Sequence, residues 1–317
     1  MEEWFGAPAQ QRIQSLEAAA VVLTRWINHL IAQGLGRLTD TQQQAIAITL
    51  NDLQASALAR RVRELPFAEA QTSQDWEEIL EQLALMRMWA LAMARRDLPE
   101  PFLLSLLQWG GMSIRRERLL AQVPAQASTW YVWGRQSEAL LDGLRLSRTW
   151  LQCTHTRRWA VLMDFAHGQA PLPNSSLDVG MAYDASLHFY PAAFPLRAIL
   201  SQTPSPNTFL TAAPQLPRIA DFLIEYADAL TRWPWLEQMP VAFDAAYLTR
   251  TPDGQFWLLD TDKSALPLSN LTSEAWQLLA FGQAKALQIM GEWNGKNLYI
   301  LSARRSDGQS WCTTGKA

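Results

Sequence analysis

Two carboxylates, Asp260 and Asp262, are separated by one residue and lie at the end of the predicted strand 255–261. Carboxylate oxygens are preferred ligands of Mg²⁺ and Ca²⁺, so this pair could hold a divalent cation beside a phosphate group. No glycine-rich phosphate-binding loop occurs in the sequence. We therefore expect the pair to form a turn or a solvated salt bridge, and we keep an enzyme that uses Asp260 and Asp262 as an alternative.

A second fragment with ligand chemistry is Cys153-Thr-His155. A Cys-x-His pair supplies two zinc ligands, but a structural zinc site needs four. The other cysteine, Cys312, is isolated, and the remaining histidines have no ligand-like spacing. The sequence therefore predicts a buried cysteine and a polar turn histidine, with no metal and no cofactor.

Further acidic residues and one histidine on predicted strands and loops could form an acid–base cluster: Asp164, Asp178, Asp184 and His188. Asp164 lies in an otherwise apolar segment, where an unpaired carboxylate would be costly to bury. We expect it to meet an arginine or a backbone donor and to serve the structure. The sequence contains no Gly-x-Ser-x-Gly elbow, Gly-x-Gly-x-x-Gly loop or Walker loop. It therefore gives no support for nucleophilic catalysis or for nucleotide binding.

Arginine and tryptophan are over-represented, with 15 Trp and with Arg far outnumbering Lys. Converging arginines would make an anion or nucleic-acid site, and tryptophan is enriched at protein-interaction hot spots. The alternatives are solvated arginines on helix surfaces and tryptophans in the core. The candidate binding surface comprises Arg115, Arg116, Arg118, Arg157, Arg158, Trp130 and Trp133.

The amino-acid composition indicates a globular protein and argues against several classes of function. The 317 residues are 49% hydrophobic and 18% charged, which is typical of a globular protein with a sizeable core. The formal net charge of −3 argues against bulk attraction to nucleic acid or to anionic lipid. The longest apolar stretch, 83–94, contains Arg87 and is shorter than the roughly 20 residues that span a bilayer. With two cysteines and no signal-peptide pattern, we expect a cytoplasmic protein that does not bind membranes.

The N-terminal part, 1–124, is predicted to be a helical domain. Apolar residues recur every three or four positions in the segments 13–30, 46–65 and 76–86. The pairs Asp40/Gln43 and Asp75/Glu78 resemble capping boxes at two helix starts. Short connections between the helices favour an antiparallel bundle or helical-repeat packing.

After the helical part, the spacing of apolar residues changes from helical to alternating. Residues 128–303 are therefore predicted to form a mainly antiparallel β domain with two or more helices. The segment 144–166 consists of two apolar runs around a polar break, which predicts a hairpin whose second strand is central in a sheet. Asn294-Gly295 predicts a second hairpin. The fold class is therefore α+β rather than a wound parallel sheet. The polar segment 304–317 is predicted to be a flexible tail.

Four segments carry a resemblance to a known family. They are Arg148-Thr-Trp-Leu151, Arg158-Trp-Ala-Val-Leu-Met-Asp-Phe-Ala166, Asp184-Ala-Ser-Leu-His-Phe-Tyr-Pro191 and Pro195-Leu-Arg-Ala198. Together they resemble the C-terminal region of bacterial SWIM zinc-finger proteins, and weaker similarity extends over 11–303. The Cys-x-Cys…Cys-x-His zinc site that names the family is absent. The chain thus resembles the region that follows the finger.

The resemblance implies a non-enzymatic protein-interaction or assembly module. It also implies a protein partner, either a separate zinc-finger subunit or a MoxR-type AAA ATPase. A nucleic-acid-binding accessory protein that uses the arginine groups and exposed tryptophans is the second hypothesis, with aromatic stacking as in single-strand binders. The third is the unrecognised enzyme that uses Asp260 and Asp262.

Overall fold

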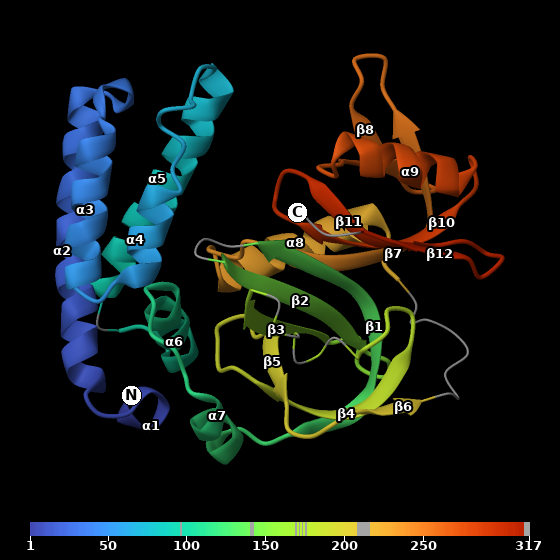
Figure 1. The fold of residues 1–317 in the computed structure, drawn as a ribbon, viewed down its shortest axis with the longest axis horizontal. Coiled ribbons are helices and arrows are strands. Elements are labelled where there is room, and N and C mark those ends of the chain that lie inside the picture. The colour runs from blue at the N-terminus through green and yellow to red at the C-terminus, as the bar shows by residue number, and fades with distance from the viewer. Residues whose placement is uncertain are drawn as a thin grey trace. The chain divides into compact units, whose positions relative to one another are not determined.

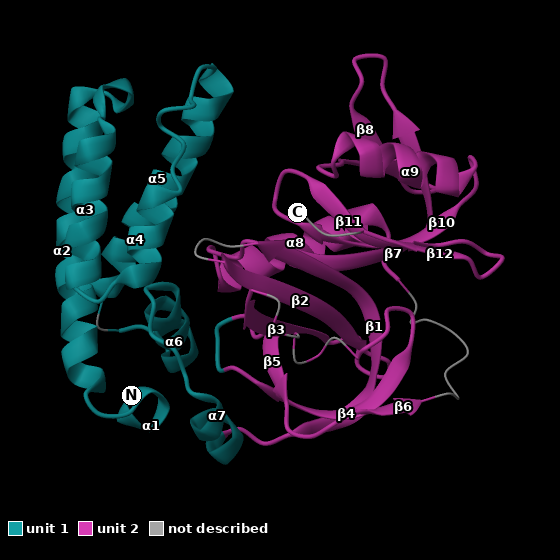
Figure 2. Cartoon of the chain, in the orientation of Figure 1, with its two compact units in different colours: residues 1–122, 191–193 teal, residues 123–190, 194–317 magenta. Residues whose placement is uncertain are grey.

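The computed structural model describes residues 1–95, 97–139, 143–168, 170, 172, 174, 176–207 and 216–313. The chain divides into two compact units, shown in teal and magenta in Figure 2. Unit 1 comprises 1–122 with 191–193, and unit 2 comprises 123–190 with 194–317. Among the described residues, no helix has the length and hydropathy to cross a membrane.

Unit 1 is helical, as predicted. Its elements, drawn in blue to green in Figure 1, are α1 (Glu2–Phe5), α2 (Ala9–Gln33), the 3₁₀ turn η1 (Leu35–Arg37), α3 (Asp40–Asp52), α4 (Ser56–Arg63), α5 (Ser73–Met93), α6 (Glu100–Trp109) and α7 (Arg116–Gln122). The apolar stripes of the sequence form the core. Leu16, Leu23 and Ile27 of α2 are fully buried, as are Leu83 and Trp89 of α5.

Threonine hydroxyls cap two of these helices. Thr39 accepts a hydrogen bond from the backbone N–H of Gln42 at the start of α3, and Thr72 does the same for Asp75 at the start of α5. Each cap is a complete capping box, because the Gln42 and Asp75 side chains also accept from the threonine backbone N–H. The predicted capping pairs were therefore wrong in register by one and by three residues.

Residues 191–193 complete the helical unit although they come late in the chain. The Gln108 side chain donates to the Pro191 carbonyl oxygen over 3.0 Å, and the Ala193 N–H donates to the Ser105 hydroxyl over 2.8 Å. Both partners belong to α6, so α6 is held partly by this returning segment. The continuous domain boundaries expected from the sequence did not include such an excursion.

Unit 2 contains two sheets. The first has the strands β1 (Gln126–Ala139), β2 (Leu144–Cys153), β3 (Trp159–His167), β4 (Ala182–Phe189), β5 (Arg197–Leu200) and β6 (Ser205–Asn207). The strand order is β1-β2-β3-β5-β4-β6, and β1 also pairs with β4, so the sheet closes on itself. All pairings are antiparallel except β3 with β5. The predicted hairpin of 144–166 is confirmed as β2 and β3, and β3 is central as expected.

The closed sheet has two buried faces. Trp130, Val132 and Leu162 belong to the cluster inside it, whereas Tyr131 and Trp133 belong to a second cluster that faces the other sheet. A strand buried on both faces carries a continuous apolar run instead of alternation. That explains the unbroken run of apolar and aromatic residues in the middle of β1.

The second sheet has the order β12-β11-β10-β7-β8-β9 and is drawn in orange and red in Figure 1. Its strands are β7 (Met239–Arg250), β8 (Phe256–Leu259), β9 (Ala265–Pro267), β10 (Leu287–Trp293), β11 (Leu298–Arg304) and β12 (Ser310–Cys312). The helices α8 (Ile219–Arg232) and α9 (Thr272–Gly282) share a core cluster with it. The described residues thus confirm an α+β fold, and β10 with β11 confirms the Asn294-Gly295 hairpin.

The expected flexible tail is ordered over most of its described part. Strand β12 pairs with β11 along 302–304, and Trp311 packs partly buried against the core cluster of the second sheet. The physical reason is the Asp307-Gly308 turn, with Gly308 at φ 88°, which returns the chain to the sheet edge. Residues 314–317 lie outside the described part of the chain.

Candidate functional site

The predicted tryptophan surface is corrected by the structure. Trp130 is 0% exposed and Trp133 is 4% exposed. The Trp130 Nε1–H donates to the Ala185 carbonyl oxygen over 3.2 Å, and the Trp133 Nε1–H donates to Gln152 Oε1 over 3.0 Å. Both indoles fill the core because β1 is covered on both faces, so neither belongs to an exposed binding surface.

The candidate arginines are divided between the two units. In unit 1, Arg118 donates to the carbonyl oxygens of Glu2 and Glu3 over 2.9 and 3.0 Å and so caps α1, while Arg115 and Arg116 are exposed. Arginine side chains near helix C-termini commonly satisfy the last carbonyls in this way. Arg118 therefore has a structural role that its spacing in the sequence did not indicate.

In unit 2, Arg157 and Arg158 lie in the turn between β2 and β3. The Arg158 guanidinium stacks 3.5 Å from the centroid of the Phe189 ring and donates to Gln126 Oε1 over 2.8 Å. Burial raises the pKa of Glu225, and the positive charge of Arg157 partly counters that rise, so these two side chains are electrostatic neighbours. Both arginine side chains of this turn thus interact with residues of unit 2.

The Asp-x-Asp pair forms a turn and an exposed salt bridge, as expected, and in addition it caps a helix. Asp260 is 6% exposed, and its carboxylate accepts hydrogen bonds from the backbone N–H groups of Asp262, Ser264 and Ile219 over 2.9, 2.9 and 3.1 Å. It thereby closes the turn after β8 and satisfies the first N–H of α8. Asp262 points to solvent and pairs with Arg218. The Asp260 carboxylate already accepts three bonds, which leaves little capacity for a cation.

The Cys153 thiol lies in a polar turn of the hairpin but is itself buried. Its Sγ lies 3.1 Å from the Ser128 hydroxyl and 3.4 Å from the Thr156 N–H, while His155 is exposed. Burial raises the pKa of the Cys153 thiol, but these hydrogen bonds outweigh it and bring the pKa below its usual range. The thiol is therefore a hydrogen-bond acceptor within the turn, as the sequence predicted for a structural cysteine.

The proposed acid–base cluster does not assemble. Asp164 accepts from the Asn174 backbone and side chain over 3.3 and 2.8 Å, and burial raises its pKa above the usual range. Asp184 accepts from the Thr129 hydroxyl over 2.5 Å, and His188 Nδ1 lies 2.7 Å from a backbone carbonyl oxygen. Within the described ranges, no group of three or more His, Cys, Asp or Glu could hold a metal ion.

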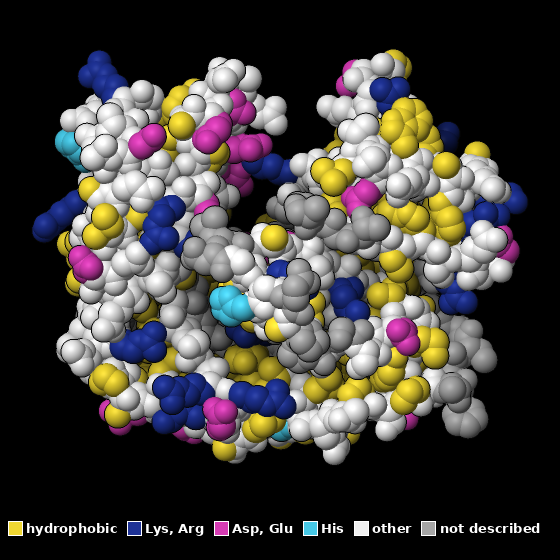
Figure 3. Space-filling model, viewed as in Figure 1, with side chains coloured by type: hydrophobic (Ala, Val, Ile, Leu, Met, Phe, Trp, Pro, Cys, Tyr) yellow, Lys and Arg dark blue, Asp and Glu magenta, His cyan; other side chains and the backbone are white. Residues whose placement is uncertain are grey.

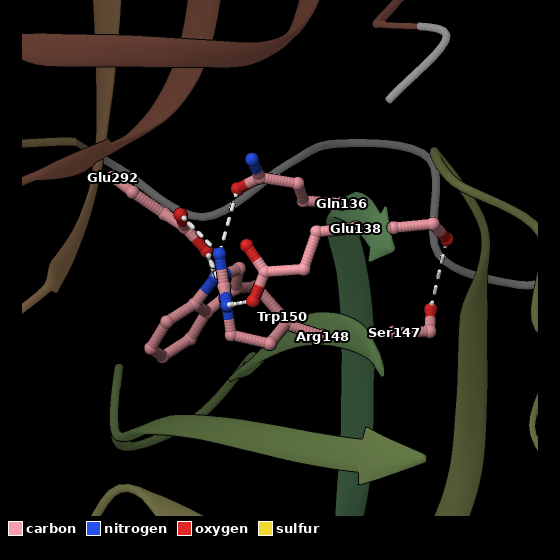
Figure 4. Close-up of polar contacts among 7 residues, drawn as sticks. Gln136, Glu138, Ser147, Arg148, Trp150 and Glu292 are labelled. Carbon is pink, nitrogen blue, oxygen red and sulfur yellow. Dashed lines mark hydrogen bonds and ion pairs between the residues drawn. The ribbon is translucent and has the colours of Figure 1, made fainter. Parts of the chain in front are cut away.

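A buried ionic network lies between the two sheets of unit 2 (Figure 4). The Arg148 guanidinium from β2 donates from Nε to Glu292 Oε1 over 3.1 Å and from Nη2 to Glu292 Oε2 over 3.3 Å. Nη1 donates to Glu138 over 2.7 Å, and Nη2 also donates to Gln136 over 2.9 Å. The Trp150 Nε1–H donates to the same Glu292 Oε1 over 2.6 Å.

This network binds strands rather than a ligand. Burial lowers the pKa of the Arg148 guanidinium, but the carboxylates of Glu292 and Glu138 outweigh it, so the net pKa lies above its usual range. Glu292 comes from β10 of the second sheet, whereas Arg148 and Glu138 come from the closed sheet. Because every nitrogen of Arg148 already has a carboxylate or amide partner, the network joins the two sheets and presents no open reactive group.

A hollow in unit 1 lies between α2 and α3. It has a volume of about 290 Å³. We call it the α2–α3 hollow, and it is lined by Trp26, His29, Leu30, Gln33, Gly34, Leu38, Gln42, Ala45, Ile46 and Thr49. Apolar side chains predominate among these described lining residues, uncharged polar ones make up the rest, and none of them is Asp, Glu, Lys or Arg.

Local sequence explains why this hollow exists. Gly34 ends α2 at φ 90°, and the short η1 turn returns the chain so that α3 runs beside α2. Trp26 is only partly buried although it neighbours the fully buried Ile27, so the apolar face of α2 is wider than the stripe that the bundle core covers. Trp26 and Ile27 are adjacent apolar residues within the predicted helical segment 13–30. The presence of both was the available signal for an additional apolar surface.

Comparison with known protein families gives one match, in this helical region. Residues 11–108 match the model of the SWIM-associated four-helix bundle domain, a range that includes the whole α2–α3 hollow. No curated protein and no solved structure matches the chain. The match agrees with the resemblance to the region that follows the zinc finger in SWIM proteins. Residues 11–108 of this chain are thus similar to the SWIM-associated four-helix bundle domain.

Proposed function

We propose that this chain is a cytoplasmic, non-enzymatic protein-interaction module whose helical unit binds a partner protein at the α2–α3 hollow. The observation that carries the proposal is the composition of the hollow, whose buried and half-buried lining residues are apolar and whose polar lining residues are exposed. A hydrophobic centre within a polar rim is the usual anatomy of a protein interface.

The chemistry of the lining favours binding over catalysis. His29 is the one titratable side chain of the hollow, and no carboxylate lines the hollow to orient or polarise it. General acid–base catalysis needs a second positioned group near the reacting atoms. In unit 2, the carboxylates of Asp260, Asp164 and Glu292 all serve hydrogen bonds that hold the fold.

The occupant that best suits this hollow is a large apolar side chain from an amphipathic segment of another protein. A charged ligand would find no opposite charge in the lining, whereas Trp26 and Leu30 offer an aromatic and aliphatic contact. The resemblance to SWIM proteins implies two candidate sources of that segment, a MoxR-type AAA ATPase and a separate zinc-finger subunit.

Filling the hollow tests the proposal. Ala45→Trp places an indole into the hollow from its exposed α3 wall, and Gln44→Trp is the matched control one residue away, outside the lining. Each tagged full-length variant is purified from its host at physiological salt, and candidate ATPase and finger subunits are quantified by mass spectrometry. We expect Ala45→Trp to lose a partner that the native chain and Gln44→Trp both retain.

Two results would contradict this function. One is an equal set of co-purified proteins for Ala45→Trp and Gln44→Trp, with both variants folded by circular dichroism. The other is a small apolar molecule, found by native mass spectrometry of the purified chain, that Ala45→Trp displaces. The second result would make the hollow a ligand site and not a protein-docking site.

A further inference from the structure

A short C-terminal segment covers part of the outer edge of β11. Residues 305–313, which we call the strap, turn back at Gly308 and add β12 to the sheet through three residue pairs. The Thr313 N–H then donates to the Leu301 carbonyl oxygen over 2.9 Å. The strap thus occupies the outer edge of β11 along 301–304.

Two half-buried side chains anchor the strand of the strap. Residues 306–310 and Cys312 are exposed, whereas Trp311 and Thr313 are half-buried. Trp311 packs against the core cluster of the second sheet, and the Thr313 hydroxyl donates to Glu274 Oε1. The turn of the strap projects at the right of Figures 1 and 3, where the surface in Figure 3 is mainly white and so not hydrophobic. A segment with so few buried contacts opens at a lower free energy than the strands beneath it.

The Glu274 carboxylate is held in place by residues outside the strap. Glu274 is 4% exposed, and its Oε2 accepts from the Tyr299 hydroxyl over 3.0 Å and from the Asn270 amide over 3.4 Å. Asn270 in turn donates to the Ile300 carbonyl oxygen over 2.9 Å and accepts from the Ile300 N–H over 2.7 Å. None of these bonds involves the strap. The carboxylate therefore keeps its position when the strap leaves, and its Oε1 then needs another donor.

We propose that the strap is a built-in occupant of a strand-addition site on the outer edge of β11, and that a strand of another protein uses this site when the strap is released. An added strand gains main-chain hydrogen bonds from the edge and specificity from its side chains. The partner segment carries an aromatic residue two positions before a Thr or Ser, because Trp311 and Thr313 show what this edge accepts. Arg305 donates to Gln283 Oε1 over 3.2 Å, so it holds the start of the strap and forms the hinge.

An extended segment fits this edge better than a helix does. The strap pairs residue by residue with 302–304, and the backbone groups of a helix interior are already bonded within the helix. An aliphatic side chain at the position of Thr313 would leave the buried Oε1 of Glu274 without its hydroxyl donor, which is costly. The strap lies in unit 2 and shares no residue with the α2–α3 hollow, so this inference does not depend on the proposed function.

Peptide binding to the full-length chain tests the site. The probe is a fluorescent peptide with the sequence of residues 305–313, carrying Cys312→Ser to prevent disulfide formation. In the native chain the strap competes with the peptide, so the apparent affinity is reduced by the fraction of chains in which the strap is open. Trp311→Ala in the chain loosens the strap and leaves Glu274 in place. We expect this variant to bind the peptide about tenfold more tightly than the native chain does.

Matched substitutions distinguish the two anchors from the rest of the strap. Thr313→Val in the chain should also raise the affinity for the unmodified peptide, because it removes the hydroxyl that occupies Glu274. In the peptide, Trp311→Ala and Thr313→Val should each weaken binding to the Trp311→Ala chain by about tenfold. Ser310→Ala is the control in chain and peptide, since Ser310 is exposed, and it should change neither affinity. Hydrogen exchange should place the protection added by the peptide in β11.

The inference fails if no chain binds the peptide up to its solubility limit, or if the native and Trp311→Ala chains bind it equally. It also fails if Trp311→Ala loses hydrogen-exchange protection throughout β10 and β11, because the strap would then be an inseparable part of the core. If sedimentation shows a native dimer that Trp311→Ala dissociates, the occupant is the strap of a second copy, and the proposed class of partner is wrong.

Discussion

Removing Arg148 while keeping Glu292 should destabilise unit 2 far more than removing both. In Arg148→Met, the Glu292 carboxylate keeps only the Trp150 Nε1–H as a donor, in a position where its side chain is 3% exposed. Breaking a buried ion pair in this way destabilises a protein by about 3–5 kcal/mol, because one charge is left without compensation.

The double variant Arg148→Met/Glu292→Met removes both charges. It leaves the Trp150 Nε1–H without its acceptor, which has a cost of about 1–3 kcal/mol for a buried donor. We therefore expect the double variant to be more stable than the single variant by roughly 2 kcal/mol. Arg218→Met is the control, since Arg218 forms an exposed pair with Asp262 and should change stability by about 1 kcal/mol or less.

Amide hydrogen exchange of the full-length chain is the suitable assay, because a two-unit protein does not guarantee two-state unfolding. Peptides from β2 and β10 report the opening free energy where the network joins the sheets. If the single and double variants lose equal protection, or if Arg148→Met behaves like Arg218→Met, then the network does not carry the coupling between the sheets that we assign to it.

Three further predictions concern other positions. Gln43→Ala should lower the free energy of unfolding of the helical unit by about 1–3 kcal/mol, measured by hydrogen exchange, since the buried Gln43 amide donates to two backbone carbonyls over 2.8 and 2.9 Å. Gly134→Ala should lower the free energy of unfolding of unit 2 by about 1–3 kcal/mol, since an added Cβ would lie 2.9 Å from both Leu301 Cβ and Met290 Sδ. Burial, with the nearby carboxylates, raises the pKa of Tyr299 to about 12. A raised native pKa is a stabilising contribution that is complete below the unfolded value near 10 and is lost as pH rises toward about 12, so Tyr299→Phe should flatten the alkaline loss of urea stability.

Local signals in the sequence predicted most of the helices and strands but not the closure of the first sheet. The apolar periodicity of α2 and the Asn294-Gly295 turn depend on neighbouring residues, so they can be recognised without the fold. The pairing of β1 with β4 joins residues more than fifty positions apart, and no local pattern encodes it. That closure buries Trp130 among residues of β4, and the second sheet covers Trp133, so neither of these surface candidates is exposed.

The candidate site was hidden for a related reason. Residues of the α2–α3 hollow have the same spacing as core residues, because the hollow is a part of the apolar face that neighbouring helices leave open. Only the solvent exposure of each side chain in the folded structure distinguishes the residues of the hollow from those of the core. The network of Arg148 was equally hidden, since its main partner Glu292 lies 144 residues further along the chain.

The return of the chain to α6 through 191–193 has a consequence for biosynthesis. A ribosome makes α1 to α7 first, but the segment that accepts from Gln108 and donates to Ser105 emerges only after β1 to β4 have been made. The helical unit of the nascent chain therefore lacks these two contacts until the strands β1 to β4 have been translated. A gene truncated after residue 122 would encode all the helices of unit 1 and still lack the last contacts that hold α6 in place.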